Sequence, residues 1–125
     1  MTRWKTNLSK MEKQTENSRL LLTLGLAARA GALIYGTDMV CAALRRAKGA
    51  PLLVIEASDT SANTRKKLTD KCRHYKVRHI VVPHSMAALG RALGKGALAA
   101  VGIVDREFCR AVEKQLDGWR DSDEV

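Results

Sequence analysis

The chain has 125 residues, of which 46% are hydrophobic and 28% charged, and its formal net charge is +9. This length suits one domain that buries enough surface to fold without disulfides or metals. The longest apolar stretch, residues 20–28, is far shorter than the roughly 20 residues that span a bilayer, and no cleavage site follows it. We therefore expect a cytoplasmic protein without a signal peptide. Three widely spaced cysteines, Cys41, Cys72 and Cys109, argue against a disulfide framework or a zinc ribbon.

Hydrophobic periodicity and capping residues predict alternating helices and strands within residues 17–116, which we expect to form one domain. Polar residues 1–16 are interpreted as a flexible basic tail, and residues 117–125 as an acidic tail. The expected elements are, in chain order, a helix at 19–30, a short strand or extended connector at 32–35, a helix from 36–38 to 47, a strand at 52–57, a helix at 63–75, a strand at 77–82, a helix at 86–93, a strand at 97–104 and a helix at 106–116. The strands are near-continuous apolar runs, which is typical of strands covered on both faces. The pattern predicts an α/β fold with one central sheet and helices on both faces.

Local signals add detail to this outline. The first helix is apolar nearly all round, so we expect burial on several of its sides. Asp59, Ser85 and Asp105 stand where helix caps are expected. Cations suit the negative end of a helix dipole. Three are expected at the C-terminal end of the second helix: Arg45, Arg46 and Lys48.

The positive charge is concentrated in the folded region. Residues 20–116 hold sixteen basic and seven acidic side chains, a net charge of +9, whereas residues 1–19 add +3 and residues 117–125 add −3. A strongly basic domain indicates a polyanionic partner, most often nucleic acid. The five aromatic residues form no row on which single-stranded bases could stack. A structured RNA or a duplex, held by backbone and shape contacts, is therefore favoured. We expect neither DNA nor a membrane as a partner.

Sites for nucleotides, metals and catalysis are not indicated. Residues 90–95, GRALGK, share glycines and a lysine with phosphate-binding loops, but the spacing differs, so we interpret them as a helix end and a turn. Cys72 and His74 are two residues apart on one helix and do not face the same way. We therefore expect no metal site, with buried cysteines and surface histidines. Scattered acidic residues without a nucleophile and base predict no enzyme and no cofactor.

The strongest binding signal precedes the second helix. Gly36 lets the backbone approach a ligand closely, and the N–H groups of the residues that follow can bind an RNA phosphate. Arg29 lies just before this segment, and the cations after the second helix add positive charge. An ordinary capped helix start is the alternative interpretation.

Five spaced motifs occur in the order found in one protein family. They are LGLAARAG (24–31), YGTD (35–38), IEASDTSANTRKKL (55–68), IVVP (80–83) and LGRALGK (89–95). With them, residues 17–112 resemble the ribosomal protein seven-Ae family, the kink-turn RNA-binding proteins, and especially its bacterial YlxQ-like branch. The resemblance implies a three-layer α/β/α sandwich with a mixed four-stranded central sheet. It also implies a ribonucleoprotein component linked to translation, with structured RNA as its partner and ribosomal RNA among the candidates.

The resemblance further implies where RNA would bind. One surface is the start of the second helix, and the other is the loop after the strand ending at Val82, which would cover an unstacked base. The implied RNA-binding residues are Arg29, Gly36, Thr37, Asp38, Met39, Arg45, Arg46, Lys48, Val82, Pro83 and His84.

The second helix departs from the family pattern Gly-x-Asn-Glu. Asp38 stands in place of the asparagine, Met39 in place of the glutamate, and Ala42 near the lysine of the next turn. Asp38 only accepts hydrogen bonds and adds negative charge, and Met39 is neither charged nor a donor. These changes weaken base-specific contacts and leave the backbone N–H groups and phosphate contacts intact. A protein-interaction module on the same fold is therefore the alternative function.

Overall fold

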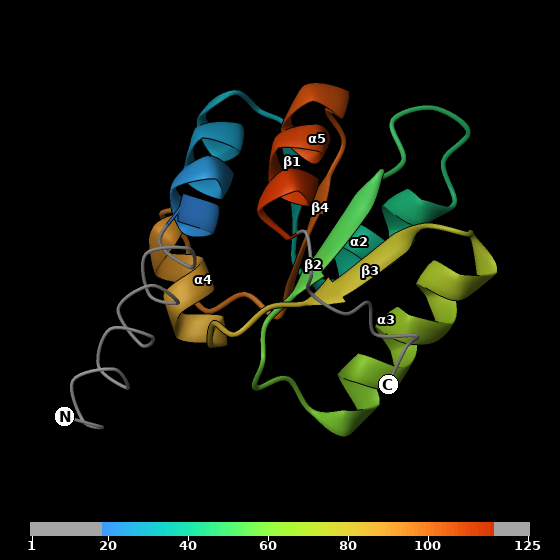
Figure 1. Cartoon of the computed structure of the whole chain (residues 1–125). Coiled ribbons are helices and arrows are strands. Elements are labelled where there is room, and N and C mark those ends of the chain that lie inside the picture. Colours follow the sequence, from blue (N-terminus) through green and yellow to red (C-terminus); the bar gives the residue numbers. More distant parts are fainter. Residues whose placement is uncertain (1–18, 117–125) are drawn as a thin grey trace, which may run out of the picture.

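The computed structural model describes residues 19–116, which form a four-stranded sheet between two layers of helices (Figure 1). The strands are β1 (Leu33–Tyr35), β2 (Leu53–Glu56), β3 (Arg78–Val81) and β4 (Ala100–Ile103). An N-terminal helix covers residues 19–29. It is followed by α2 (Thr37–Leu44), α3 (Ala62–His74), α4 (Met86–Ala92) and α5 (Arg106–Gln115). The predicted tails, 1–16 and 117–125, lie outside the described residues.

The sheet is mixed, as the family resemblance implied, with the strand order β1-β4-β2-β3. β4 runs antiparallel to both neighbours, so that Ile103 is paired with Leu33 on one side and with Leu53 on the other. β2 and β3 are parallel. Since β4 alone runs in the opposite direction, β1, β2 and β3 all end at the same edge of the sheet. We call this the carboxyl edge.

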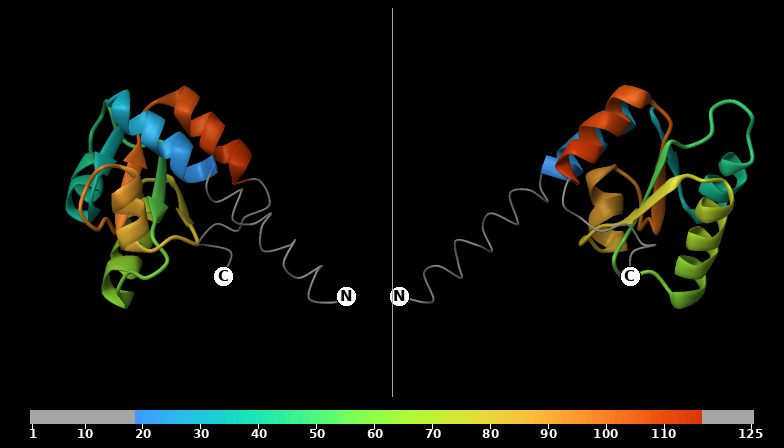
Figure 2. Two further views of the ribbon diagram at one scale, coloured as in Figure 1. Left: turned by 90° about the vertical axis from the view of Figure 1, so that its left-hand side faces the viewer. Right: turned by 45° about the vertical axis from the view of Figure 1, so that its right-hand side comes forward.

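Helices cover both faces of the sheet and create two hydrophobic cores, which confirms the predicted sandwich. The N-terminal helix, α4 and α5 pack on one face, and α2 and α3 on the other (Figure 2). The larger core includes Leu24, Ile55 and Val112, and the smaller one includes Val40 and Leu68. Every residue of β2 and β4 is buried, as expected for strands covered on both faces.

Side-chain caps start three of the helices. Cap oxygens accept backbone N–H bonds over 3.0–3.1 Å from the residue three positions on: Ser61 from Thr64, Ser85 from Ala88 and Asp105 from Phe108. The expectation for Ser85 and Asp105 is confirmed. Asp59 does not cap the helix that follows it in sequence. Its carboxylate instead accepts the Met86 N–H at 2.8 Å, because folding brings the loop after β2 against the start of α4.

Two expectations about helices were wrong. The second helix ends at Leu44, where Arg45 and Arg46 N–H groups bond to carbonyls three residues back and tighten the last turn. The predicted cations therefore lie beyond the helix. The N-terminal helix leaves Leu22 and Leu26 exposed, because only part of its surface packs on the sheet and on neighbouring helices.

All three cysteines are free and buried, as predicted, but the prediction that histidines lie at the surface is wrong for His79. Its side chain is 3% exposed, and its Nε2 donates to Oε1 of Glu56 at 2.8 Å. A hydrogen-bonding partner makes burial of a polar ring tolerable. That partner precedes His79 by 23 residues and is reached only through strand pairing.

Residues 90–96 form a helix end and a turn, as predicted, and Gly90 is required there by packing. α4 ends at Ala92, and a turn follows. A Cβ atom on Gly90 would stand 1.9 Å from the carbonyl oxygen of Gly96, so no larger residue fits without displacing backbone. The close approach of this turn to α4 explains Gly90, whereas Gly94 has a φ of +71°, a backbone conformation that favours glycine.

Candidate functional site

The two RNA-contact segments implied by the resemblance lie at opposite ends of the carboxyl edge. Gly36 follows β1, residues 57–60 follow β2 and residues 82–85 follow β3. Backbone hydrogen bonds tie them together: Gly36 N–H donates to the first carbonyl of β4 at 2.8 Å, and Ser58 N–H donates to the His84 carbonyl at 2.8 Å. Neighbouring strands lie about 4.8 Å apart, so the three strand spacings between β1 and β3 place the two segments about 14 Å apart.

α2 begins without a side-chain cap. Gly36 occupies the cap position with a φ of +87°, a backbone region that favours glycine. No side chain of the described residues bonds the N–H groups of the first turn as a cap. Asp38 and Met39 project from this turn into solvent, with the Asp38 side chain 93% exposed and Met39 55% exposed. The helix end can therefore offer N–H groups to an external anion.

A cation from α3 also reaches the start of α2. Nζ of Lys67 lies 3.4 Å from Oδ1 of Asp38, in a solvent-exposed and therefore weak ion pair. Burial raises the pKa of the neighbouring Cys41 thiol, and the positive charges of Lys67 and Lys71 partly oppose that rise. The charges of both lysines therefore act on the first turns of α2.

The loop after β3 presents Pro83 to solvent. Val82 is only 1% exposed as a whole residue and belongs to the larger core, so it anchors the turn and offers the surface no contact of its own. His84 N–H donates to the Val82 carbonyl at 2.9 Å, which closes a tight turn with Pro83 at its tip. The hydroxyl of Ser58 donates to the His84 carbonyl at 3.2 Å, beside the backbone bond from the same residue. The turn is therefore held in place with Pro83 pointing outward.

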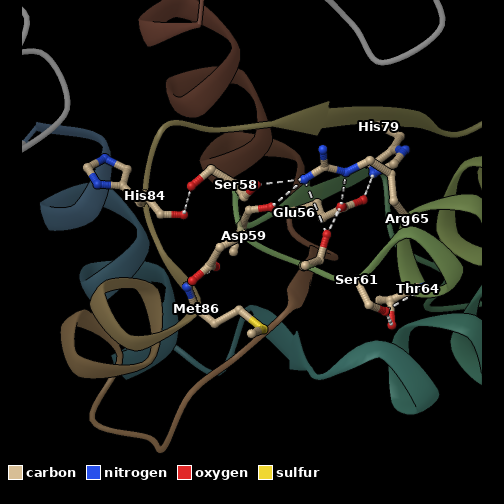
Figure 3. Close-up of polar contacts among 11 residues, drawn as sticks. Glu56, Ser58, Asp59, Ser61, Thr64, Arg65, His79, His84 and Met86 are labelled. Carbon is tan, nitrogen blue, oxygen red and sulfur yellow. Dashed lines mark hydrogen bonds and ion pairs between the residues drawn. The ribbon is translucent and has the colours of Figure 1, made fainter.

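A buried ionic network lies beneath the centre of the edge (Figure 3). The carboxylate of Glu56 is fully buried and accepts hydrogen bonds from Arg65 Nε at 2.7 Å, His79 Nε2 at 2.8 Å and the hydroxyl of Thr60. Burial raises the pKa of Glu56, but hydrogen bonds from His79, Thr60 and Arg65 outweigh it. The pKa consequently lies below its ordinary value of 4.5. Glu56 is therefore ionised at neutral pH.

Arg65 connects this network to the loops. Its Nη2 donates to the carbonyls of Ala57 and Ser58 at 3.2 and 3.0 Å, and Ser58 and Asp59 in turn bond the segment after β3. Sequence reasoning missed these positioning residues. The signal that could have found them was Glu56, a charge at the end of an apolar strand, because a buried charge requires a partner.

The implied phosphate-binding cations after α2 lie apart from the carboxyl edge. Arg45, Arg46 and Lys48 follow the far end of α2 from Gly36. Eight helical residues span about 12 Å, so an RNA touching both groups must extend along α2.

Arg29 lies in the other helical layer. It lines a groove of about 740 Å³ between the N-terminal helix and α4, together with Leu22 and Leu26. Nζ of Lys95 stands 4.7 Å above the centre of the Tyr35 ring in the same groove. Because Tyr35 is the last residue of β1, the groove reaches the carboxyl edge.

Within residues 19–116, no group of three or more His, Cys, Asp or Glu side chains is placed to hold a metal ion. No helix in this range is long and apolar enough to cross a membrane. Burial raises the pKa of the Cys109 thiol to about 11, and Glu113 adds to the effect, so this thiol is a poor nucleophile. The chemistry that the edge can supply is anion binding by N–H groups and cations.

Comparison with known proteins identifies the family of this chain. A family model described as "Ribosomal protein L7Ae/L30e/S12e/Gadd45 family" matches residues 18–113. RNA-binding protein YlxQ of Bacillus subtilis (strain 168) is 43% identical over 94 residues, which is 75% of this chain and 91% of that protein. RNA-binding protein YlxQ of Enterococcus faecium is 36% identical over 95 residues, or 76% of this chain and 88% of that protein.

Two solved structures have the same fold. A protein with unknown function from Bacillus halodurans C superposes with a TM-score of 0.71 at 39% identity, covering 78% of this chain and 96% of that one. The Giardia lamblia 15.5kD RNA binding protein superposes with a TM-score of 0.69 at 21% identity, covering 83% and 87%. At the lower identity the likeness concerns the fold alone.

Proposed function

Because this chain belongs to the ribosomal protein L7Ae/L30e/S12e/Gadd45 family, we propose that it is a non-enzymatic protein that binds folded RNA at the carboxyl edge. One observation carries the proposal: the α2 start without a side-chain cap and the exposed, anchored Pro83 turn share this edge. Two relatives that cover most of the chain are named RNA-binding proteins, which supports the same function. The RNA shape we propose is a kink-turn, and ribosomal RNA is a candidate source in a cytoplasmic, translation-linked particle.

In the proposed mechanism the two ends of the edge have different tasks. A phosphate accepts hydrogen bonds from N–H groups of the first turn of α2, where the helix dipole also favours negative charge. The Pro83 turn covers one unstacked base, and the buried Val82 fixes this turn to the core. Cations beyond α2 hold phosphates farther along the RNA, and they would contribute affinity and not base specificity.

The test is titration with a kink-turn RNA and with a straight duplex of matched composition, each over a range of salt concentration. With roughly four to six phosphates engaged, log affinity against log salt should have a slope of about −3 to −5. Arg45→Ala combined with Arg46→Ala should flatten the slope. A slope near zero for the parent protein, or equal affinity for the two RNAs, would remove the proposed recognition.

A second test concerns the departure from the family pattern at Asp38 and Met39. Asp38→Asn adds a donor and removes a charge beside phosphate, and Met39→Glu adds an acceptor for guanine N–H groups. One charge-assisted hydrogen bond contributes about 1.5–3 kcal/mol, so the double variant should bind a kink-turn at least roughly tenfold more tightly. Thermal melting checks that the variant is folded. If a folded double variant gains no affinity, this surface does not bind the RNA.

The groove beside β1 favours a second candidate function, a protein-interaction module. It places the exposed Leu22 and Leu26 next to the cations Arg29, Arg91 and Lys95. Apolar anchors ringed by polar groups are typical of protein interfaces. Binding that depends on Leu22 and Leu26 and only weakly on salt would favour this function over RNA binding.

A further inference from the structure

Most of the positive charge of the described residues lies on and just after α3. Residues 62–78 contain seven basic and one acidic side chain, a net charge of +6, whereas residues 19–61 and 79–116 each carry only +2. Arg65 and Arg78 lie within ion-pair distance of Glu56 and Glu113 respectively. Lys67 forms a solvent-exposed pair with Asp38. The other basic side chains of this segment are Lys66, Lys71, Arg73 and Lys76, which are exposed except for the half-buried Lys71.

Two of these lysines run alongside α2. α2 and α3 lie next to each other on one face of the sheet (Figures 1 and 2) and share the smaller core. Lys67 reaches Asp38 in the first turn of α2, and Lys71 lies one turn further along α3, on the same side of that helix. The charges of both act on Cys41, one turn further along α2. The lysines thus lie beside the stretch between the start of α2 and Arg45.

Lys67 and Lys71 supply positive charge beside a part of the proposed binding surface that has no cation of its own. The exposed side of α2 carries no cation between Thr37 and Leu44, and Ala42 occupies the region where the family pattern places a lysine. Cations from the adjacent helix occupy the flank of the same stretch. A backbone that enters at the carboxyl edge and continues toward Arg45 would pass them.

The exposed side chains of α3 are better suited to binding a nucleic acid than to binding a protein. The large exposed apolar side chains of the described residues are Leu22, Leu26, Met39 and Leu52, and none of them belongs to α3. Centres of protein interfaces depend on apolar and aromatic anchors, whereas a phosphate backbone needs only cations. This inference rests on the proposed function: we propose that Lys67 and Lys71, together with the exposed Lys66 next to Lys67 on α3, form a further RNA-binding surface, which holds the phosphate backbone beside the element bound at the carboxyl edge.

The test compares two triple variants of the full chain with equal loss of charge. The first is Lys66→Gln, Lys67→Gln and Lys71→Gln on α3. The control is Arg106→Gln, Arg110→Gln and Lys114→Gln on α5, which lies on the opposite face. Glutamine keeps good helix propensity, and melting verifies the fold. The probe is a kink-turn RNA with a long helix on each side, titrated at several salt concentrations.

For the α3 variant, the salt slope should become shallower by about 2 to 3, at about 0.7–0.9 for each lost phosphate contact. At 0.1 M salt this corresponds to roughly fivefold to eightfold weaker binding for each contact. The α5 variant should stay within about twofold of the parent. Equal losses in both variants would indicate a general effect of net charge and overturn the inference.

The remaining outcomes separate this inference from the proposed function. If the parent binds with a steep slope and the α3 variant matches it, the inference fails and the proposed function stands. If the parent binds no RNA, both fail. Polyglutamate that competes as well as RNA would identify an acidic protein partner and overturn the inference.

A second experiment applies if the α3 variant does not fold: acetylation of the lysines of the unmodified chain with and without RNA. Bound RNA should protect Lys66, Lys67 and Lys71 but not Lys114. Equal labelling with and without RNA would refute the inference.

Discussion

Replacing the buried carboxylate beneath the carboxyl edge should destabilise the protein and remove part of its pH dependence. Glu56→Gln keeps the size of the side chain but removes the charge that Arg65, His79 and Thr60 all contact. The glutamine amide offers one acceptor oxygen, and its NH₂ group can bond to Thr60 or His79 only if that partner accepts instead of donating. The variant therefore cannot satisfy the same three partners.

The geometry sets the size of the effect. The Glu56 side chain has no exposed surface, so water cannot replace the lost bonds. A hydrogen bond to a charged group contributes about 1.5–3 kcal/mol. The Arg65 side chain is 40% exposed and can turn back to solvent, so its share must be discounted. We expect the free energy of unfolding at pH 7 to fall by about 2–4 kcal/mol, measured by urea denaturation.

The pH dependence supplies a second readout. Because the folded-state pKa of Glu56 lies below its ordinary 4.5, the carboxylate stabilises the fold above that pH, and the stabilisation is lost as pH falls through the folded pKa. The difference between parent and Glu56→Gln should therefore be largest at neutral pH and shrink below about pH 4.5. Glu113→Gln, at a 38% exposed carboxylate 4.0 Å from Arg78, is the matched control and should cost less than about 1 kcal/mol. A Glu56→Gln cost below that of the control, or one independent of pH, would refute the role of the network.

Three further predictions follow from single contacts. Cys109, whose pKa burial raises to about 11, should react with iodoacetamide at pH 8 far more slowly in the folded chain than in urea, and equal rates by mass spectrometry would contradict its burial. Gly90→Ala places a Cβ atom 1.9 Å from the Gly96 carbonyl oxygen and should cost about 1–3 kcal/mol in urea denaturation; a neutral effect would show that the turn can shift freely. Asp105→Ala removes the cap on the Phe108 N–H and should cost about 1 kcal/mol, whereas Asp105→Asn should retain most of the stability.

Features that depend on neighbours in sequence could be predicted. The alternation of helices and strands, the caps at Ser85 and Asp105 and the burial of β2 and β4 all follow from residues within a few positions of one another. A cap bonds three residues ahead, and a continuous apolar run requires cover on both faces. The segments around Gly36 and Pro83 could be named as a candidate site because the family motifs mark them in sequence.

Features that depend on which segments meet in space could not be predicted from the sequence. Periodicity indicates that a residue is buried, but not what it will contact there. Glu56 contacts His79 only because β2 pairs with β3, and Asp59 accepts the first N–H of α4 only because two loops share the carboxyl edge. Lys67 reaches Asp38 across 29 positions of sequence because α2 and α3 pack on one face.

The distribution of cations was likewise decided by tertiary structure. In sequence, Arg29 precedes Gly36 by seven residues, and Arg45 and Arg46 follow it by nine and ten. The structure nevertheless puts Arg45 and Arg46 at the far end of α2 and Arg29 in the opposite helical layer. Sequence alone therefore determined the amount of positive charge and the elements that carry it. Strand order and helix packing decided which charges can act on one ligand, because electrostatic attraction depends on separation in space and not on separation along the chain.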